Sequence, residues 1–214
     1  MTVAGVLGVL VLHNLLTNLW FTDRWTYVPV NLATAGGLVA VAGVGVPMGA
    51  WWPGVAAGGA VLTAIALVGV AAPRLLADQR MAGVDGRATA WRALVRIPLG
   101  TVVLEEVAFR AVLPALLSPV AAAALFGLWH IAPTAKALDV NGVRRHRAGA
   151  VAGAVALTAV VGLVLWELRV AAGGVAAPAL VHVAANSGAT VAAFVVFRRT
   201  SGLTASWCRR HPRS

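Results

Sequence analysis

The sequence predicts an all-α fold, a polytopic bundle of transmembrane helices that forms a single membrane domain over residues 1–214. Hydrophobic residues make up 60% of the chain, whereas their share in an ordinary soluble domain is nearer about half. The mean hydropathy is +0.85, and several apolar runs are long enough to cross roughly 30 Å of hydrocarbon. We therefore expect an integral, multi-pass membrane protein with about seven transmembrane helices.

Polar segments separate the apolar runs and divide the domain into parts. The runs are 3–21, 28–46, 54–72, 97–117, 120–135, 148–165 and 175–197, and the fifth is short for a span. The parts are three N-terminal helices at 1–72, a cytoplasmic loop at 73–96, a four-helix core at 97–197 and a basic cytoplasmic tail at 198–214. The core carries the polar residues inside its spans, so we expect the chemistry there.

Basic residues give the chain a formal net charge of +10 and indicate its orientation. In a seven-helix arrangement all of the clustered cations fall on one side, and the opposite side holds only Arg169. The clustered cations are Arg24, Arg74, Arg80, Arg87, Arg92, Arg96, Lys136, Arg144, Arg145, Arg147, Arg198, Arg199, Arg209, Arg210 and Arg213. Cytoplasmic loops are enriched in Arg and Lys, which predicts an outside N-terminus and a cytoplasmic C-terminus.

The distribution of the basic residues also indicates which partners the protein binds. The cations lie between and after apolar runs rather than on a soluble face with aromatic platforms, which argues against nucleic acid and favours anionic lipid. A single cysteine, Cys208, excludes an intramolecular disulfide framework and a multi-thiolate metal site. We expect membrane lipid as the main partner and a prokaryotic cell membrane as the location.

Two adjacent acids lie inside the fourth apolar run. Glu105 and Glu106 are two of only three glutamates in the chain, and an acid at mid-membrane costs about 2.5–3.5 kcal/mol on insertion scales. Four residues apart on a helix, Glu106 and Arg110 share a face and can pair. Glu105 points about 100° away from Glu106, which leaves it as the carboxylate for proton transfer.

Two further pairs at a spacing of four lie on later runs. Phe126 and His130 share a face of the fifth predicted helix, so the ring can support the histidine. His182 and Asn186 place an imidazole and a carboxamide on one stripe of the seventh. Both can donate hydrogen bonds to one oxygen, as stabilisation of an oxyanion requires. Taken alone, each pair is more typical of hydrogen bonding between helices than of catalysis.

Depth along the helices gives a check on whether these groups can meet. At about 1.5 Å per residue, Glu105 lies roughly 12 Å from the cytoplasmic end of its run, and His182 lies roughly 22 Å from the end of its own. The mismatch would be repaired by a tilted seventh helix or by different helix ends. If they meet, a carboxylate, imidazoles and an amide donor suit hydrolysis of a peptide carbonyl, with Glu105 as general base beside His130.

The three motifs together resemble those of a known family. Glu105-Glu106-Val-Ala-Phe-Arg110 fits the pattern Glu-Glu-x-x-x-Arg, Phe126 to His130 fits Phe-x-x-x-His, and His182 to Asn186 fits His-x-x-x-Asn. These patterns, in this order, are those of the CAAX protease and bacteriocin-processing family (CPBP, Abi or type II CAAX prenyl endopeptidase) of intramembrane proteases.

The resemblance implies an intramembrane endopeptidase acting on a membrane-associated or prenylated CAAX-type peptide or protein. Glu105 and His130 would activate water, His182 and Asn186 would bind the oxyanion, and Glu106 and Arg110 would assist, with Phe126 as a support. The family's usual core has eight spans, so we expect seven to eight helices. The first three helices carry no motif.

Three alternatives remain at this stage. Glu105, His130 and His182 could form a zinc site with an open position for water, but His-Glu-x-x-His is absent, so we favour a metal-free mechanism with no cofactor. A proton-coupled transporter would also bury Glu and Arg, although no paired halves are evident. A non-catalytic bacteriocin-immunity protein could keep the same cavity.

Overall fold

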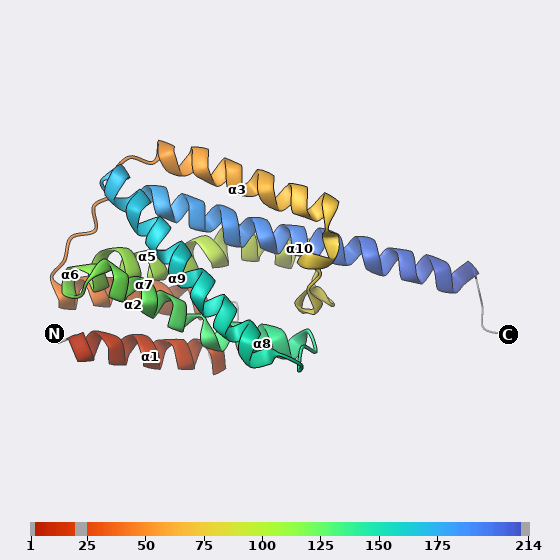
Figure 1. The fold of residues 1–214 in the computed structure, drawn as a ribbon, viewed down its shortest axis with the longest axis horizontal. Coiled ribbons are helices and arrows are strands. Elements are labelled where there is room, and N and C mark those ends of the chain that lie inside the picture. The colour runs from red at the N-terminus through yellow and green to blue at the C-terminus, as the bar shows by residue number, and fades with distance from the viewer. Residues whose placement is uncertain (1–2, 20–24, 211–214) are drawn as a thin grey trace.

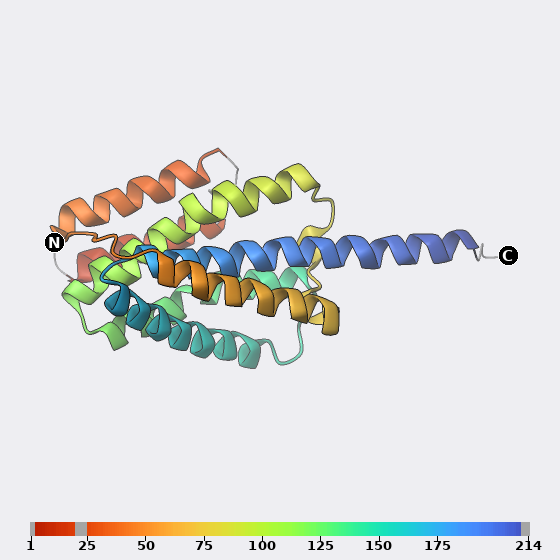
Figure 2. The same cartoon turned by 90° about the horizontal axis from the view of Figure 1, so that it is seen from above.

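The computed structural model describes residues 3–19 and 25–210, with backbone only for Leu19 and 201–210. The predicted end of the first run at Phe21, and the charges Arg24 and Arg213, lie outside this part. Throughout it, every regular element is a helix, as predicted. The α-helices are α1 (Val3–Leu19), α2 (Tyr27–Ala42), α3 (Trp52–Ala71), α4 (Gly86–Trp91), α5 (Val103–Glu106), α6 (Leu113–Leu116), α7 (Pro119–Trp129), α8 (Ile131–Val140), α9 (Arg147–Ala172) and α10 (Ala176–Arg210). Figures 1 and 2 show the long helices lying side by side in a bundle.

The surface of the bundle is suited to lipid. Three helices are long and apolar enough to span a bilayer, namely α3, α9 and the part of α10 over Ala176–Thr200, and α1 and α2 are shorter apolar helices. Large apolar side chains on them are exposed, including Val70 at 80% and Leu157 at 64%. Monomeric soluble proteins rarely expose contiguous apolar surface of this kind. The chain is therefore an integral membrane protein, and the number of spans stays a prediction.

One continuous helix runs from Gly86 to Leu116 through α4, η3 (Arg92–Val102), α5, η4 (Val107–Val112) and α6. Its junction residues Arg92, Val103 and Val107 all have right-handed helical dihedrals. The segments η3 and η4 are π-helical, with bonds five residues back, as from Leu113 N–H to the Ala108 carbonyl. Such wide turns are rare and are frequent at functional sites. Here they enclose the two adjacent glutamates.

This helix begins earlier than predicted, so the loop expected at 73–96 is shorter. Asp85 caps the helix, because its Oδ1 accepts a hydrogen bond of 2.7 Å from Ala88 N–H. Only the connection before it is irregular, with short 3₁₀ turns at η1 (Pro73–Leu76) and η2 (Gln79–Met81). Hydropathy delimits the stretch that prefers lipid, and a helix can continue beyond that stretch into the polar interface.

The fifth run, predicted at 120–135, is not one helix, and that prediction is wrong. Ser118 caps α7, which ends at His130, and α8 follows in a different direction. His130 Nδ1–H donates to the Phe126 carbonyl at 2.8 Å, which is the acceptor that the His130 backbone N–H would use in a continued α-helix. That N–H bonds instead to Gly127 O at 3.0 Å. A side chain that competes for a backbone acceptor in this way breaks the helix.

The two ends of the bundle differ in composition. In Figure 1 the basic connection before α4, the helix α8 and the end of α10 lie towards one end, and the N-terminus lies at the other. At that other end the α2–α3 connection bonds to the α9–α10 turn through Ala50 N–H to Ala172 O and Val175 N–H to Pro47 O. Gly174 allows this close approach, since a Cβ there would lie 2.3 Å from the Met48 carbonyl carbon.

Candidate active site

The two adjacent glutamates lie in the interior of the bundle. Glu105 is 6% exposed and Glu106 is 2% exposed, and both belong to α5, between the two π-helical segments. Burying a charge is costly unless it is paired and hydrogen-bonded, so the partners of each carboxylate decide what the site can do.

His182 of α10 lies between the two carboxylates. Its Nδ1 is 2.8 Å from Glu106 Oε1, and its Nε2 is 3.4 Å from Glu105 Oε2. A carboxylate oxygen accepts, so Nδ1–H donates to Glu106. The two carboxylates therefore share one partner that the sequence did not predict, because one imidazole reaches both side chains.

Arg110 pairs with Glu106, as the spacing of four predicts. Arg110 Nε is 3.6 Å from Glu106 Oε2, and the two side chains are 1% and 2% exposed. The guanidinium carbon lies 4.1 Å from the centroid of the Phe126 ring, a distance typical of a cation–π contact. Among the described residues no group hydrogen-bonds to the buried Nη1 and Nη2 atoms of Arg110.

Phe126 joins the two histidines. Its ring meets the His130 ring edge-on with centroids 4.7 Å apart, and meets the His182 ring at 5.9 Å. It is 2% exposed and belongs to the main hydrophobic core, with Leu104 and Phe109. The predicted Phe126–His130 contact is thus present, and the same ring also packs against α10.

His130 ends α7 and is partly buried. Its Nδ1–H is committed to the Phe126 carbonyl, so in the neutral ring Nε2 is the free acceptor. Within the described chain no direct contact joins His130 to Glu105. His130 contacts the ring of Phe126, which also packs against His182, but His130 does not contact the Glu105 carboxylate.

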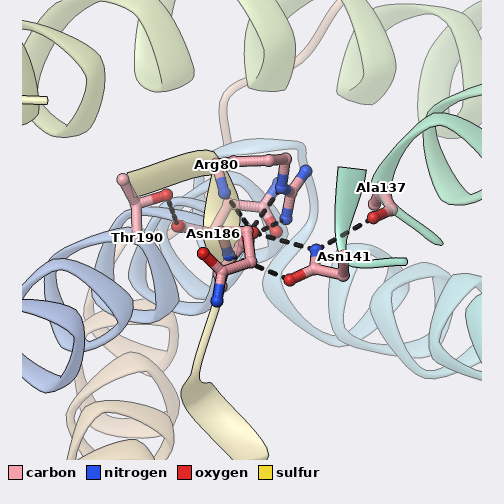
Figure 3. A network of polar contacts seen from close by, with 7 residues as sticks. Arg80, Ala137, Asn141, Asn186 and Thr190 are labelled. Atoms are coloured by element: carbon pink, nitrogen blue, oxygen red, sulfur yellow. Dashed lines mark hydrogen bonds and ion pairs between the residues drawn. The ribbon is translucent and has the colours of Figure 1, made fainter. Parts of the chain in front are cut away.

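Asn186 lies one helical turn beyond His182 and is partly buried. Its main-chain carbonyl accepts from Thr190 Oγ1 at 2.8 Å. Figure 3 shows Asn186 beside Thr190, and no hydrogen bond of its carboxamide is found with the other described residues. The structure does not join Asn186 to Glu105 or His182 directly, and its amide remains able to donate.

The same view shows how the polar connection before α4 is tied to the α8 end. Asn141 Oδ1 accepts from Gln79 N–H at 2.9 Å, and Asn141 Nδ2 donates to Asp78 Oδ1 at 3.1 Å (Figure 3). Burial alone would raise the pKa of the Asp78 carboxyl, but the hydrogen bonds from Arg80 and Asn141 lower it below its usual value.

One residue at the site was not predicted. Trp129 Nε1–H donates to Glu105 Oε1 at 2.9 Å, so Glu105 is held by an indole on one oxygen and faces His182 with the other. The available signal was the rule that a buried tryptophan N–H needs a partner. Tryptophans at helix ends are also typical of a membrane interface, so the sequence alone does not distinguish Trp129 from an interfacial tryptophan.

The predicted zinc ligands do not fit a metal ion in this arrangement. Glu105, His130 and His182 do not converge, and both ring nitrogens of His182 face carboxylates. In the described part of the chain no three His, Cys, Asp or Glu side chains are grouped so as to hold a metal.

The two carboxylates are buried and lie away from the grooves on the surface of the bundle. Two apolar grooves, of about 750 and 570 Å³, lie on the outside of the bundle. The larger lies along α7 and α9, the other between α3 and α10, and neither is lined by Glu105, Glu106 or His182.

The comparisons with known proteins agree with the motifs. Residues 87–188, just under half of the chain, match the family described as type II CAAX prenyl endopeptidase Rce1-like. No curated protein and no solved structure matches the chain. The matched region contains all three motifs and the three residues whose side chains pair with or donate to the two carboxylates, namely Arg110, Trp129 and His182. The chain is therefore similar, over residues 87–188, to the Rce1-like family of type II CAAX prenyl endopeptidases.

Proposed function

We propose that this protein is an intramembrane endopeptidase that hydrolyses a peptide bond of a membrane-associated, CAAX-type substrate with a water activated by Glu105. The observation that carries the proposal is the buried contact of His182 with both Glu105 and Glu106, at 3.4 and 2.8 Å. These groups come from two helices of the region that matches the Rce1-like family. Buried ionisable groups inside an apolar bundle usually serve a reaction or a pathway.

Charge balance supports Glu105 as the base. Glu105, Glu106 and Arg110 together would carry one net negative charge, and a buried cluster favours neutrality. One further proton provides it, and His182 is placed to hold that proton between the two carboxylates. Glu105 is then ionised and able to accept a proton, while His182 Nε2–H is available as a donor.

The reaction follows from these positions. Glu105 takes a proton from water as the water oxygen bonds to the scissile carbonyl carbon. The carbonyl oxygen becomes an oxyanion, to which His182 Nε2–H and the Asn186 amide donate. When the intermediate collapses, the C–N bond breaks and the proton held by Glu105 passes to the leaving nitrogen. His130, whose Nε2 accepts, would orient the water from the α7 side.

Metal is not required by this scheme, and we propose that none takes part. The proposal is supported by the side chains themselves, since His182 directs both nitrogens to carboxylates. Nothing in the structure favours a proton-coupled transporter or a non-catalytic immunity protein.

The test is cleavage of a membrane-tethered fluorogenic peptide by the purified protein in proteoliposomes. Glu105→Gln and His130→Asn each remove a base while keeping polarity, and turnover should fall about 100-fold or more, the range of general-base catalysis. Glu167→Gln and His146→Asn are matched controls, because both side chains are exposed, and should leave turnover unchanged. Full turnover by both test variants would disprove the mechanism.

Two further arms of the same assay address substrate and metal. Comparing the cleavage rates of prenylated and unprenylated versions of one peptide tests whether the lipid is needed. Treatment with a chelator should leave turnover unchanged. If turnover fell and only added zinc restored it, the metal-free mechanism would be wrong.

We also propose a multi-pass arrangement in a prokaryotic cell membrane with the C-terminus in the cytoplasm. Its support is the gathering of the basic connections towards one end of the bundle in Figure 1. Reporter fusions at 83 and at the C-terminus should give a cytoplasmic signal, and a fusion at 45 an external one. The opposite pattern would invert the orientation.

A further inference from the structure

A second polar group supports Glu105 through its other oxygen. Trp129 Nε1–H donates to Glu105 Oε1 at 2.9 Å, whereas Oε2 faces His182. The indole is fixed on two sides. The His13 ring stacks on it with centroids 6.2 Å apart and planes inclined by 11°, and the Phe109 ring meets it edge-on at 5.6 Å.

The first helix supplies two of the residues that hold Trp129. Besides the His13 ring, Asn14 Nδ2 donates to the Trp129 main-chain carbonyl at 2.9 Å. This carbonyl is in the last turn of α7, just before the break at His130. Asn14 therefore satisfies an acceptor that the ended helix leaves open, and it ties α1 to the end of α7.

His13 is itself held by the second helix. Its ring is 6% exposed, and Nε2 is 3.2 Å from Asn31 Oδ1 while Nδ1 is 2.9 Å from Thr34 Oγ1. Asn31 Nδ2 donates to the Tyr27 carbonyl, which assigns Oδ1 as the acceptor and places a proton on His13 Nε2. Hydrogen bonds at both ring nitrogens fix the plane of the ring, and so the plane against which the indole lies.

We propose that Trp129, His13 and Asn14 are positioning residues for the reaction, through which α1 holds the carboxylate of Glu105 in the rotamer that faces His182. The inference rests on the proposed role of Glu105. It assigns a role to α1, which has no motif and lies outside the region matched to the family. A catalytic group held within about 0.5 Å of its productive position works best when neighbours lock its rotamer.

Turnover gives the first test. Trp129→Phe keeps an aromatic ring and removes the N–H, and Asn14→Leu removes the tie to α7. A hydrogen bond to a charged group has a net effect that corresponds to about a 10- to 100-fold change. Trp129→Phe should lower kcat by about that factor with KM within about twofold. Trp52→Phe and Leu12→Ala, at exposed positions on α3 and α1, should leave kcat unchanged.

Non-additivity separates positioning from a general loss of stability. Asn14→Leu should lower kcat less than Trp129→Phe, and the double variant should be no slower than Trp129→Phe alone, because both act through one hydrogen bond. An unchanged kcat in Trp129→Phe, or effects that multiply in the double variant, would overturn the inference.

A readout without turnover distinguishes this inference from the proposed function. In protein labelled with ¹⁵N-tryptophan, the indole N–H resonance missing from Trp129→Phe identifies Trp129. That resonance should shift in Glu105→Ala and in Asn14→Leu, and should stay in place in Leu12→Ala. If Glu105→Gln kept full turnover, the base would be wrong while these shifts could still appear. If the resonance stayed in place in Glu105→Ala, the positioning contact would be wrong whatever the activity.

Discussion

Replacing Arg110 by methionine tests whether the buried ion pair holds the site together. Methionine is of similar length, so it fills much of the space beside Phe126 while removing the charge. The change would remove the arginine partner of Glu106 in a position where the glutamate side chain is only 2% exposed. We expect the variant to be strongly destabilised even though little core volume is lost.

The size of the effect follows from the distance between the two groups. Two unit charges 3.6 Å apart attract by roughly 5 kcal/mol at an effective dielectric constant of about 20. Removing one partner of a buried pair typically costs about 3–5 kcal/mol, because the other charge stays buried without compensation. Both values indicate a loss of several kcal/mol for Arg110→Met, and a similar loss for Glu106→Gln alone.

The double variant Glu106→Gln, Arg110→Met provides the comparison. Glutamine keeps an oxygen that accepts from His182 Nδ1–H, and neither charge remains, so we expect the double variant to be more stable than either single one. Unfolding is followed by circular dichroism during SDS titration in mixed micelles, with wild type and Glu167→Gln as references. A loss below about 1 kcal/mol in Arg110→Met, or single losses that simply add, would refute the reasoning.

Two predictions concern the ends of the bundle. Gly174→Ala should destabilise the protein by about 1–3 kcal/mol, because its Cβ would lie 2.4 Å from the Gly49 nitrogen, whereas Gly59→Ala meets nothing within 4 Å; SDS titration compares the two. Asp78 has a pKa lowered by its hydrogen bonds to Arg80 and Asn141, so its stabilising effect is complete above pH about 4 and is lost as the pH falls through the lowered value. Limited proteolysis of the connection before α4 should therefore be slow at pH 7 and fast at pH 3, and Asp78→Asn should be cut faster at pH 7.

Contacts within one helix were predictable from the sequence. The Glu106–Arg110 pair and the Phe126–His130 contact both follow from a spacing of four residues, which fixes a shared face whatever the helix packs against. The all-helical fold followed equally directly from composition and from the length of the apolar runs. These features depend on local geometry or on bulk hydropathy, both of which one sequence contains.

Contacts between helices depended on helix ends that hydropathy misplaces. Counting from predicted ends set Glu105 and His182 roughly 10 Å apart in depth, yet their side chains lie 3.4 Å apart. Of the residues predicted as a loop, 86–96 are helical and lie beside α10, where Ser187 Oγ donates to the Ala93 carbonyl at 2.7 Å. The polar side chains of that segment lowered its hydropathy without preventing helix formation.

The π-helical turns and the break at His130 could not be predicted for a different reason. A π-helix differs from an α-helix in which carbonyl each N–H chooses, and the break depends on one ring nitrogen taking the Phe126 carbonyl. The energy differences are small compared with the burial of the surrounding apolar side chains. Hydrophobic periodicity, which reports the buried face, does not detect them.

The shared histidine changes how variants of the two glutamates have to be interpreted. In an ideal α-helix Glu105 and Glu106 point about 100° apart, which suggests two separable functions, but each side chain is long enough to reach a different nitrogen of His182. A change at Glu106 therefore alters the contacts of His182, which also faces Glu105. Loss of turnover in Glu106→Gln alone would not identify Glu106 as the base. The two roles separate only if Glu105→Gln removes turnover with stability retained, while Glu106→Gln loses both and recovers stability when Arg110 is also neutralised.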